Sequence, residues 1–224
     1  KKIGLPFMCA GNPVHINAET LARLTRTGLV GLGAGIQSYS ETVRRTIFNR
    51  QTSDRRMDAA IEDITRFDDS VKAICYDFIV DFPGDTDAYK KENIRRLNRL
   101  KRNFTINIFP FTAYPGTALA EGLPLDHPAR AGIYRLSNPY APSYLNRLLR
   151  ITPHTSPKLV SLFLQNERPG IRFLFKIYYA YYARIKRPAG VMRLMAQWYA
   201  HALLDRLAVT RKGSGRFESF KFEH

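Results

Sequence analysis

The sequence predicts an α/β fold: a partial (β/α) barrel with four parallel strands, followed by an α-helical C-terminal region. Over residues 1–122, short apolar runs alternate with amphipathic segments, which is typical of strands joined by crossover helices in a parallel sheet. From Pro124 onward, prolines and amphipathic segments of helical spacing replace this alternation. We therefore divide the chain into a half barrel, residues 1–122, and a basic helical tail, residues 123–224.

The first strand is predicted over Ile3–Cys9, a helix over Asn17–Thr27 and the second strand over Val30–Ile36. The second strand is unusual because it contains three alternating glycines, Gly31, Gly33 and Gly35. Glycine weakens a strand. We therefore expect either that another group approaches this backbone closely or that the strand packs tightly in a barrel.

The remaining elements of this half follow in order: helices over 40–48 and 53–67, a strand over 71–82, a helix over 86–102 and a strand over 104–111. Ser40 is the expected N-cap of the first of these helices. Four strands with three helical crossovers make half of an eight-stranded barrel or most of a six-stranded one. A complete small doubly wound domain is the alternative.

The C-terminal region is predicted to be helical over residues 143–150, 157–165, 170–185 and 189–209. It carries 17 Lys and Arg against 5 Asp and Glu, within a net charge of +16 for the chain. Such an excess attracts polyanions or anionic lipid over long distances.

The third of these helices places Phe173, Ile177 and Tyr181 on one face, with basic residues interleaved. This pattern suits a helix packed over an open barrel end, which we rank first, or peripheral contact with an anionic membrane, which we rank second. Nucleic acid ranks third, because no recognised binding motif accompanies the charge.

Cysteine usage and hydropathy indicate a cytoplasmic protein, with membrane association left open. Cys9 and Cys75 are too few and too far apart for a disulfide framework or a metal site, which indicates a reducing compartment. We expect Cys9 to be a core residue. No signal peptide opens the sequence, and basic residues interrupt the apolar part of the tail before it reaches the length of a membrane span.

Three motifs occur in order: GAGIQSYSETVRRTIFNRQTS, YDFIVDFPGDT and INIFPFTAYPGTALAE. In this order and spacing they resemble the second half of the core of radical S-adenosylmethionine (SAM) enzymes, particularly those with an N-terminal cobalamin-binding domain. The resemblance covers residues 1–122. It implies SAM and a 4Fe-4S cluster as cofactors, with cobalamin as an optional third. It also implies radical chemistry or methyl transfer on a small-molecule or lipid-like substrate.

The candidate SAM-binding residues begin at the end of the second strand. Gln37 is expected at the C-terminal end of a parallel strand, where ligands bind, and its amide suits the hydroxyls of a ribose. Ser38 would contact the same ligand or cap the following loop. The alternative for Gln37 is a polar strand end that only caps this loop.

Arg50 and Asp77 complete the candidate set. The planar guanidinium of Arg50 matches a carboxylate, and the resemblance implies that it holds the methionine carboxylate of SAM. A solvated surface arginine is the alternative, as expected for several neighbours: Arg44, Arg45, Arg55 and Arg56. Asp77, in the middle of the third strand, is expected to face the barrel interior, where a carboxylate needs a partner. It could meet SAM, orient Arg50 or hold a loop.

The sequence departs from the family pattern at two positions: Asp81 replaces the usual glycine and Asp85 the usual glutamate. We expect the first change to alter the pocket. Pro83-Gly84 and Pro115-Gly116 are turn residues and not catalysts.

The cluster ligands of the family, three thiolates in a CxxxCxxC loop, are absent from this sequence. The resemblance places that loop, the other strands and any cobalamin domain upstream of Lys1, so the chain is expected to be an inactive fragment when alone. We assign no catalytic residue and no metal ligand. The alternative is a non-catalytic basic module that binds a membrane or an acidic partner.

Overall fold

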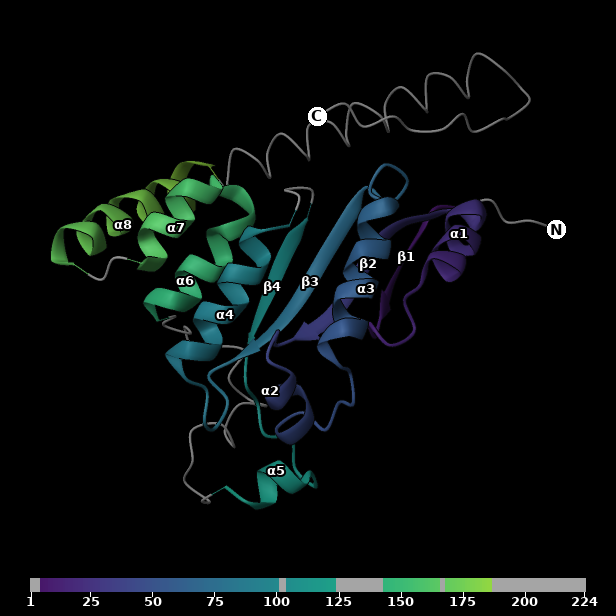
Figure 1. The fold of residues 1–224 in the computed structure, drawn as a ribbon, viewed down its shortest axis with the longest axis horizontal. Helices are drawn as coiled ribbons and strands as arrows, with labels where there is room; N and C mark the ends of the chain where they lie inside the picture. The colour runs from purple at the N-terminus through teal and green to yellow at the C-terminus, as the bar shows by residue number, and fades with distance from the viewer. Residues whose placement is uncertain (1–4, 101–103, 124–142, 166–167, 187–224) are drawn as a thin grey trace, which may run out of the picture. The chain divides into compact units, whose positions relative to one another are not determined.

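The computed structural model describes residues 5–100, 104–123, 143–165 and 168–186. It shows a four-stranded parallel sheet with helices between the strands, so the predicted α/β fold is confirmed (Figure 1). The first elements are β1 (Phe7–Gly11), α1 (Ala18–Thr27), β2 (Leu29–Gln37), α2 (Glu41–Thr46), α3 (Asp54–Arg66), β3 (Ala73–Val80), α4 (Asp87–Asn98), β4 (Thr105–Pro110) and α5 (Ala118–Glu121). The helical C-terminal region has α6 (Tyr144–Ile151), η2 (Thr152–His154), α7 (Pro157–Gln165), α8 (Pro169–Tyr181) and the π-helical turn η3 (Tyr182–Lys186).

The strands lie in the order β1-β2-β3-β4, each parallel to its neighbour. A doubly wound sheet reverses its strand order at a switch point, and this sheet does not reverse among the described strands. Because right-handed crossovers between successive neighbouring strands all pass on one side, the helices lie on one face of the sheet. This is the arrangement of half a (β/α) barrel.

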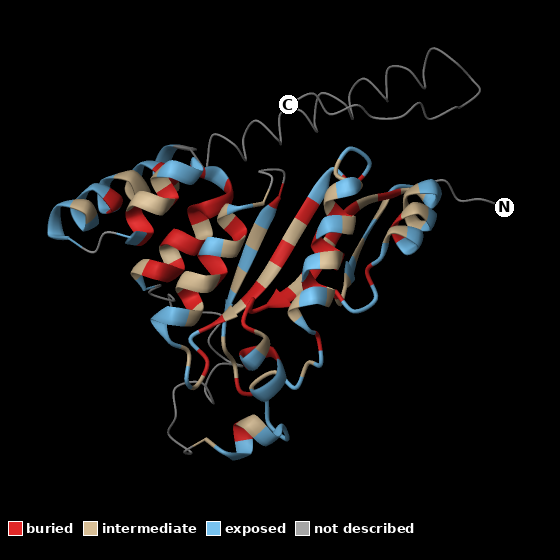
Figure 2. Cartoon of the chain, viewed as in Figure 1, coloured by how far each residue is buried: buried red, intermediate tan, exposed pale blue. Residues whose placement is uncertain are grey.

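Burial alternates along the strands as this arrangement requires (Figure 2). Alternate side chains of β3, namely Ile74, Tyr76, Phe78 and Val80, are buried beneath the helices. The other face is open: Asp77 is half-buried, while Met8 and Phe109 are exposed. The open face corresponds to the interior of a barrel, which is the face on which Asp77 was expected.

Side chains cap the starts of α1, α2, α3 and α4. Asn17, Ser40, Ser53 and Thr86 each accept a hydrogen bond from a backbone N–H three residues later. Gly28 ends α1 with φ of 112°, a left-handed conformation that glycine adopts without strain.

Some boundaries differ from prediction. Strand β1 begins at Phe7 because Pro6 has no backbone N–H to donate to a ladder, so Cys9 lies in the middle of the strand and not at its end. The short helix α5, capped by Thr117, was not predicted. The helix predicted over 189–209 lies outside the described residues.

Contacts divide the chain into two compact units, Lys1–Asn166 and Glu167–His224. In the first unit, α4 packs against α6 and α7, with Ile94, Leu97, Leu148 and Leu149 fully buried. Asn98 of α4 donates to the Pro157 carbonyl and to Ser161 of α7. The boundary predicted at residue 122 adjoins undescribed residues and stays a prediction.

Candidate functional site

The C-terminal edge of the sheet collects the candidate residues. All four strands are parallel, so the segments after β2, β3 and β4 leave from the same edge. Gln37 ends β2, and Arg50 lies in the loop between α2 and α3 that returns from this edge. Asp77 is opposite Gly35 of β2, on the open face. The topology therefore places Gln37, Arg50 and Asp77 in one region.

Gln37 is the most unusual residue of this region. Its φ is 59°, in the left-handed region that costs a non-glycine residue roughly 1–2 kcal/mol. Its side chain is 9% exposed, and its amide oxygen Oε1 is buried without a hydrogen-bond partner among the described residues. A buried acceptor without a partner costs about 1–3 kcal/mol. Backbone strain and an unsatisfied amide thus coincide at the predicted ligand-binding position.

Glycines on β2 make room for this side chain. A Cβ on Gly35 would lie 3.1 Å from both amide atoms of Gln37, so the amide folds back over the bare backbone of Gly35. A Cβ on Gly31 would lie 2.6 Å from the methyl carbon of Met8, which covers that glycine. Of the two explanations predicted for these glycines, close approach holds at Gly31 and Gly35, where the protein's own side chains make it, whereas Gly33 has only ordinary contacts.

Two buried side chains hold the loop after Gln37. Arg44 donates from its guanidinium to the Ser38 carbonyl at 2.9 Å. Asn93 of α4 accepts a hydrogen bond from the Tyr39 backbone N–H at 2.7 Å. These two hydrogen bonds hold the backbone of Ser38 and Tyr39, and thereby the backbone conformation of Gln37 before them.

Arg44 was expected to be a solvated surface residue, and this expectation is wrong. The residue is fully buried. Besides Ser38 it donates to the Thr52 carbonyl at 3.0 Å and to Asp54 Oδ1 at 2.6 Å. One arginine thus ties the end of β2 to the start of α3. The pattern ETVRRT contains two adjacent arginines and gives no sign of which one turns inward.

The side chain of Ser38 makes a hydrogen bond within the protein, whereas that of Arg50 makes none with the described residues. Ser38 is fully buried, and its hydroxyl accepts a hydrogen bond from the Ser40 backbone N–H at 3.2 Å, a local turn contact. Arg50 is half-buried, and its backbone N–H donates to the Arg44 carbonyl at 2.8 Å. Its guanidinium makes no hydrogen bond or ion pair with any described residue, so it has donors to offer to a ligand.

Asp77 has two partners on the open face, one on the neighbouring strand β4 and one on its own strand. Asn107 of β4 donates from its side-chain amide to Asp77 Oδ1 at 2.9 Å, and the Cys75 thiol lies 3.9 Å from the same oxygen. Burial raises the pKa of the Cys75 thiol, and the charge of Asp77 raises it further. The second carboxylate oxygen of Asp77 accepts no hydrogen bond recorded within the described segments.

Asp81 belongs to a separate network. Its φ is 58°, in the left-handed region that glycine adopts more readily than aspartate. Its carboxylate accepts hydrogen bonds from Lys90 Nζ at 2.7 Å and from the side-chain amide of Asn146 at 2.9 and 3.0 Å. Asp85 accepts from the Asp81 backbone N–H at 2.7 Å. The extra side chain at this position therefore joins the β3–α4 loop to α4 and α6.

The two cysteines cannot share a metal. Cys9 is paired with Leu32 on the helix-covered face, whereas Cys75 is paired with Gly33 on the open face. Burial also raises the pKa of Cys9 above its ordinary value, as it does for Cys75. No group of three His, Cys, Asp or Glu side chains that could hold a metal occurs in the described parts of the chain.

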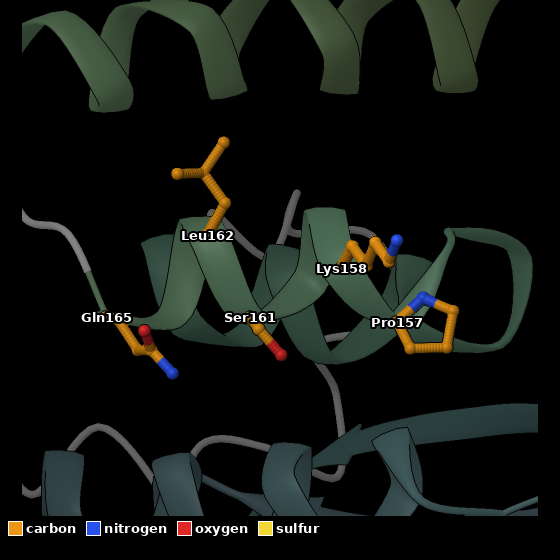
Figure 3. A pocket seen from close by; sticks show the side chains of 5 residues that line it. All are labelled: Pro157, Lys158, Ser161, Leu162 and Gln165. Carbon is orange, nitrogen blue, oxygen red and sulfur yellow. The ribbon is translucent and has the colours of Figure 1, made fainter.

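A hollow of about 460 Å³ lies elsewhere, on α7 (Figure 3). It is open to solvent and lined by one helix only, by Pro157, Lys158, Ser161, Leu162 and Gln165. Lys158 is the only titratable group in this lining, and none of the predicted site residues contributes to it. We do not place the functional site there.

Comparison with known proteins adds no family: neither the scan against models of protein families nor the search of curated proteins finds a match. In the segments that the structure covers, every helix is too short or too polar to cross a bilayer.

Proposed function

We propose that residues 5–123 form the SAM-binding part of a radical SAM enzyme, with Gln37, Arg50 and Asp77 as the residues that hold SAM. The sequence resemblance motivates the proposal, and it is supported by the strand order, by Gln37 at the end of β2 and by Asp77 on the open face of β3. The substrate class stays open, with a hydrophobic small molecule as the expectation. Cobalamin stays an optional second cofactor.

The buried amide of Gln37 carries the proposal. A protein retains backbone strain and an unsatisfied acceptor together where the surrounding structure enforces them, and such positions concentrate at ligand sites. A ribose hydroxyl donating to Oε1 would satisfy the acceptor. The loop anchors Arg44 and Asn93 would hold the backbone that carries this amide, and the side chain would turn outward to present its buried oxygen to the ligand.

Arg50 and Asp77 provide the charges that the amino acid end of SAM needs. The guanidinium of Arg50 can bind a carboxylate through two parallel hydrogen bonds. Asp77 can accept a hydrogen bond from the ammonium group at its second oxygen, while Asn107 holds the first. Ser38 acts in this proposal by shaping the turn that follows Gln37.

The 4Fe-4S cluster does not fit the described residues, because Cys9 and Cys75 lie on opposite faces of the sheet. In radical SAM enzymes such a cluster supplies the electron that cleaves SAM. Under our proposal its ligands come from outside this sequence, and we derive no chemical step for the chain itself.

Ligand binding tests the proposal on the chain as it stands. We expect Gln37→Gly to weaken binding of both SAM and adenosine by about tenfold, the value of one lost hydrogen bond. Arg50→Gln should weaken binding of SAM but not of adenosine, which has no carboxylate. Isothermal titration calorimetry measures both constants. The matched controls are Gln51→Ala and Arg55→Gln, exposed residues of the same types nearby.

Protein stability separates a binding role from a structural one. Glycine relieves the strain at φ of 59° and removes the unsatisfied amide, so Gln37→Gly should be at least as stable as the parent in urea. Unchanged affinity for SAM in Gln37→Gly would overturn the assignment. A large loss of stability with unchanged affinity would show that Gln37 only holds the loop.

The second candidate is a non-catalytic basic module. It is favoured by the charge of residues 123–224, where 17 Lys and Arg stand against 5 Asp and Glu. The genomic sequence upstream decides between the two candidates. A CxxxCxxC motif in the same reading frame supports the enzyme, and a start codon directly before the codon of Lys1 would leave the basic module.

A further inference from the structure

We propose that helix α8 binds an anionic lipid surface through its exposed apolar face. The inference rests on the second compact unit alone and is independent of the proposed SAM site. It concerns a helix that lies on a bilayer and does not cross it.

Helix α8 has two apolar faces, and only one is covered. Phe175 and Tyr182 are buried, and the rings of Phe175 and Tyr179 stack with centroids 5.9 Å apart. The uncovered face consists of five side chains, each between 45% and 65% exposed: Phe173, Leu174, Ile177, Tyr181 and Ile185. An amphipathic helix of a compact protein normally has one apolar stripe and a polar remainder.

The uncovered face is contiguous. Phe173, Ile177 and Tyr181 are spaced by four residues, so they form one row along the helix, and Leu174 lies about 100° from Phe173 on the next row. Together the five side chains expose several hundred Å² of apolar surface, the size at which an exposed patch marks an interaction site. Tyrosine contributes a polar tip, which suits the boundary between acyl chains and water.

Charge identifies the partner. Arg172 and Lys176 are exposed and follow one another on the flank of this row, and Arg184 is exposed at its C-terminal end. Residues 168–186 contain no Asp or Glu. Across the whole second unit, 12 Lys and Arg stand against 4 Asp and Glu. Lysine and arginine beside an apolar stripe can reach lipid phosphates while the stripe enters the acyl boundary.

An anionic bilayer fits this face better than nucleic acid or a second copy of the chain. Nucleic acid would use the cations but would leave the apolar row in water. A second copy presenting the same face would bring two cationic flanks together, which is unfavourable. An anionic lipid surface can bury the apolar row in its acyl boundary and also bind the cations of the flank through its phosphates.

Vesicle flotation with the whole chain tests the inference. We expect binding to vesicles of phosphatidylcholine mixed with phosphatidylglycerol, weaker binding to phosphatidylcholine alone, and a decrease with added salt. Phe173→Ser with Ile177→Ser should lower the partition constant at least about tenfold. The matched control, Leu5→Ser with Val14→Ser, removes two exposed apolar side chains from the first unit and should bind normally.

The charge contribution has its own pair of variants. Arg172→Gln with Lys176→Gln should lower binding to anionic vesicles by about fivefold per charge, roughly 25-fold in total. The control Arg23→Gln with Lys72→Gln removes the same net charge from exposed positions of the first unit and should have a much smaller effect.

Four outcomes would overturn the inference. The first is an absence of vesicle binding by the parent chain. The second is equal binding by the Phe173→Ser/Ile177→Ser variant, which would show that nonspecific charge attraction suffices. The third is binding of DNA in preference to vesicles, measured by adding duplex DNA as a competitor. If the serine variant instead loses self-association in sedimentation, the face is an interface between copies.

Discussion

Arg44 provides the sharpest test of how this fold holds its candidate site. Replacing it by alanine removes three hydrogen bonds that join the end of β2, the loop after α2 and the start of α3. The guanidinium is fully buried, and so are Ser38 and Thr52, whose carbonyls it serves. Arg44→Ala therefore leaves two buried acceptors without their donor.

The expected cost follows from these contacts. A buried acceptor that loses its partner costs about 1–3 kcal/mol, so two such carbonyls cost about 2–6 kcal/mol. The ion pair with Asp54 adds less than about 1 kcal/mol, because that carboxylate is 40% exposed and also binds Arg96. Since water can enter the space left behind, we expect a loss of about 3–5 kcal/mol. This is a large part of the roughly 5–15 kcal/mol that stabilises a domain.

Urea unfolding followed by far-ultraviolet circular dichroism measures this loss. Arg45→Ala is the matched control: Arg45 is exposed and pairs with Glu41 at 3.6 Å across one helical turn, which is worth less than about 0.5 kcal/mol. Arg44→Lys keeps the charge but cannot make all three hydrogen bonds, so its urea midpoint should lie between those of Arg44→Ala and Arg45→Ala. Indistinguishable urea midpoints for Arg44→Ala and Arg45→Ala would refute the assignment of Arg44 as the buried tie.

Four further predictions follow from the same contacts. Asp81→Gly should be about 1 kcal/mol more stable than Asp81→Ala, because both lose the bonds to Lys90 and Asn146 but only glycine tolerates φ of 58°; equal urea midpoints would contradict this. Burial lowers the pKa of Lys90, but its hydrogen bond to Asp81 and the charges of Asp85 and Asp81 outweigh burial, so the pKa is raised. Lys90 thus contributes stability that is complete below its ordinary pKa of about 10.4 and is lost as the pH rises through the folded value. The urea midpoint should therefore fall above that pH, and it should fall less in Lys90→Met. Strands β1 and β4 are the edges of the described sheet, so sedimentation should show dimers or larger species, and a monodisperse monomer would argue against open edges. Reconstitution of this chain with iron and sulfide should give no 4Fe-4S absorption, and a full cluster spectrum would disprove the placement of its ligands outside the sequence.

Much of the fold was predictable because its signals are local. The capping residues Asn17, Ser40 and Ser53 marked helix starts correctly, and the alternation of apolar runs gave the four strands. The parallel order of neighbouring strands followed from the crossover helices. The start of β1 was missed because the apolar run begins before Pro6, which ends the possible ladder.

The candidate site was predictable only in part, because burial and backbone strain depend on tertiary contacts. Gln37 was identified by its position at a strand end, but nothing in the sequence indicates its positive φ or its unsatisfied amide. Arg44 was assigned to the surface because its sequence neighbours are also basic. Its burial arises from the return of the chain at Thr52, which brings a second carbonyl to the guanidinium.

The side chain of Asp81 has a different role from the one expected from the sequence. A glycine at this position would only permit the turn after β3, and a side chain was expected to alter the pocket. The structure instead directs the carboxylate to Lys90 and Asn146, on helices α4 and α6. The partner on α6 is 65 residues away in sequence, so local pattern could not reveal it.

The side-chain amide of Gln37 offers the most direct measurement of the central proposal. Nuclear magnetic resonance of the ¹⁵N-labelled chain reports this amide, and loss of the signal in Gln37→Gly assigns it. Titration with SAM should shift the Gln37 signal saturably, while the side-chain amide of Gln165, exposed on α7 and outside the proposed site, should stay in place. An unchanged Gln37 signal at SAM concentrations that shift other residues would contradict the proposal that this amide binds SAM.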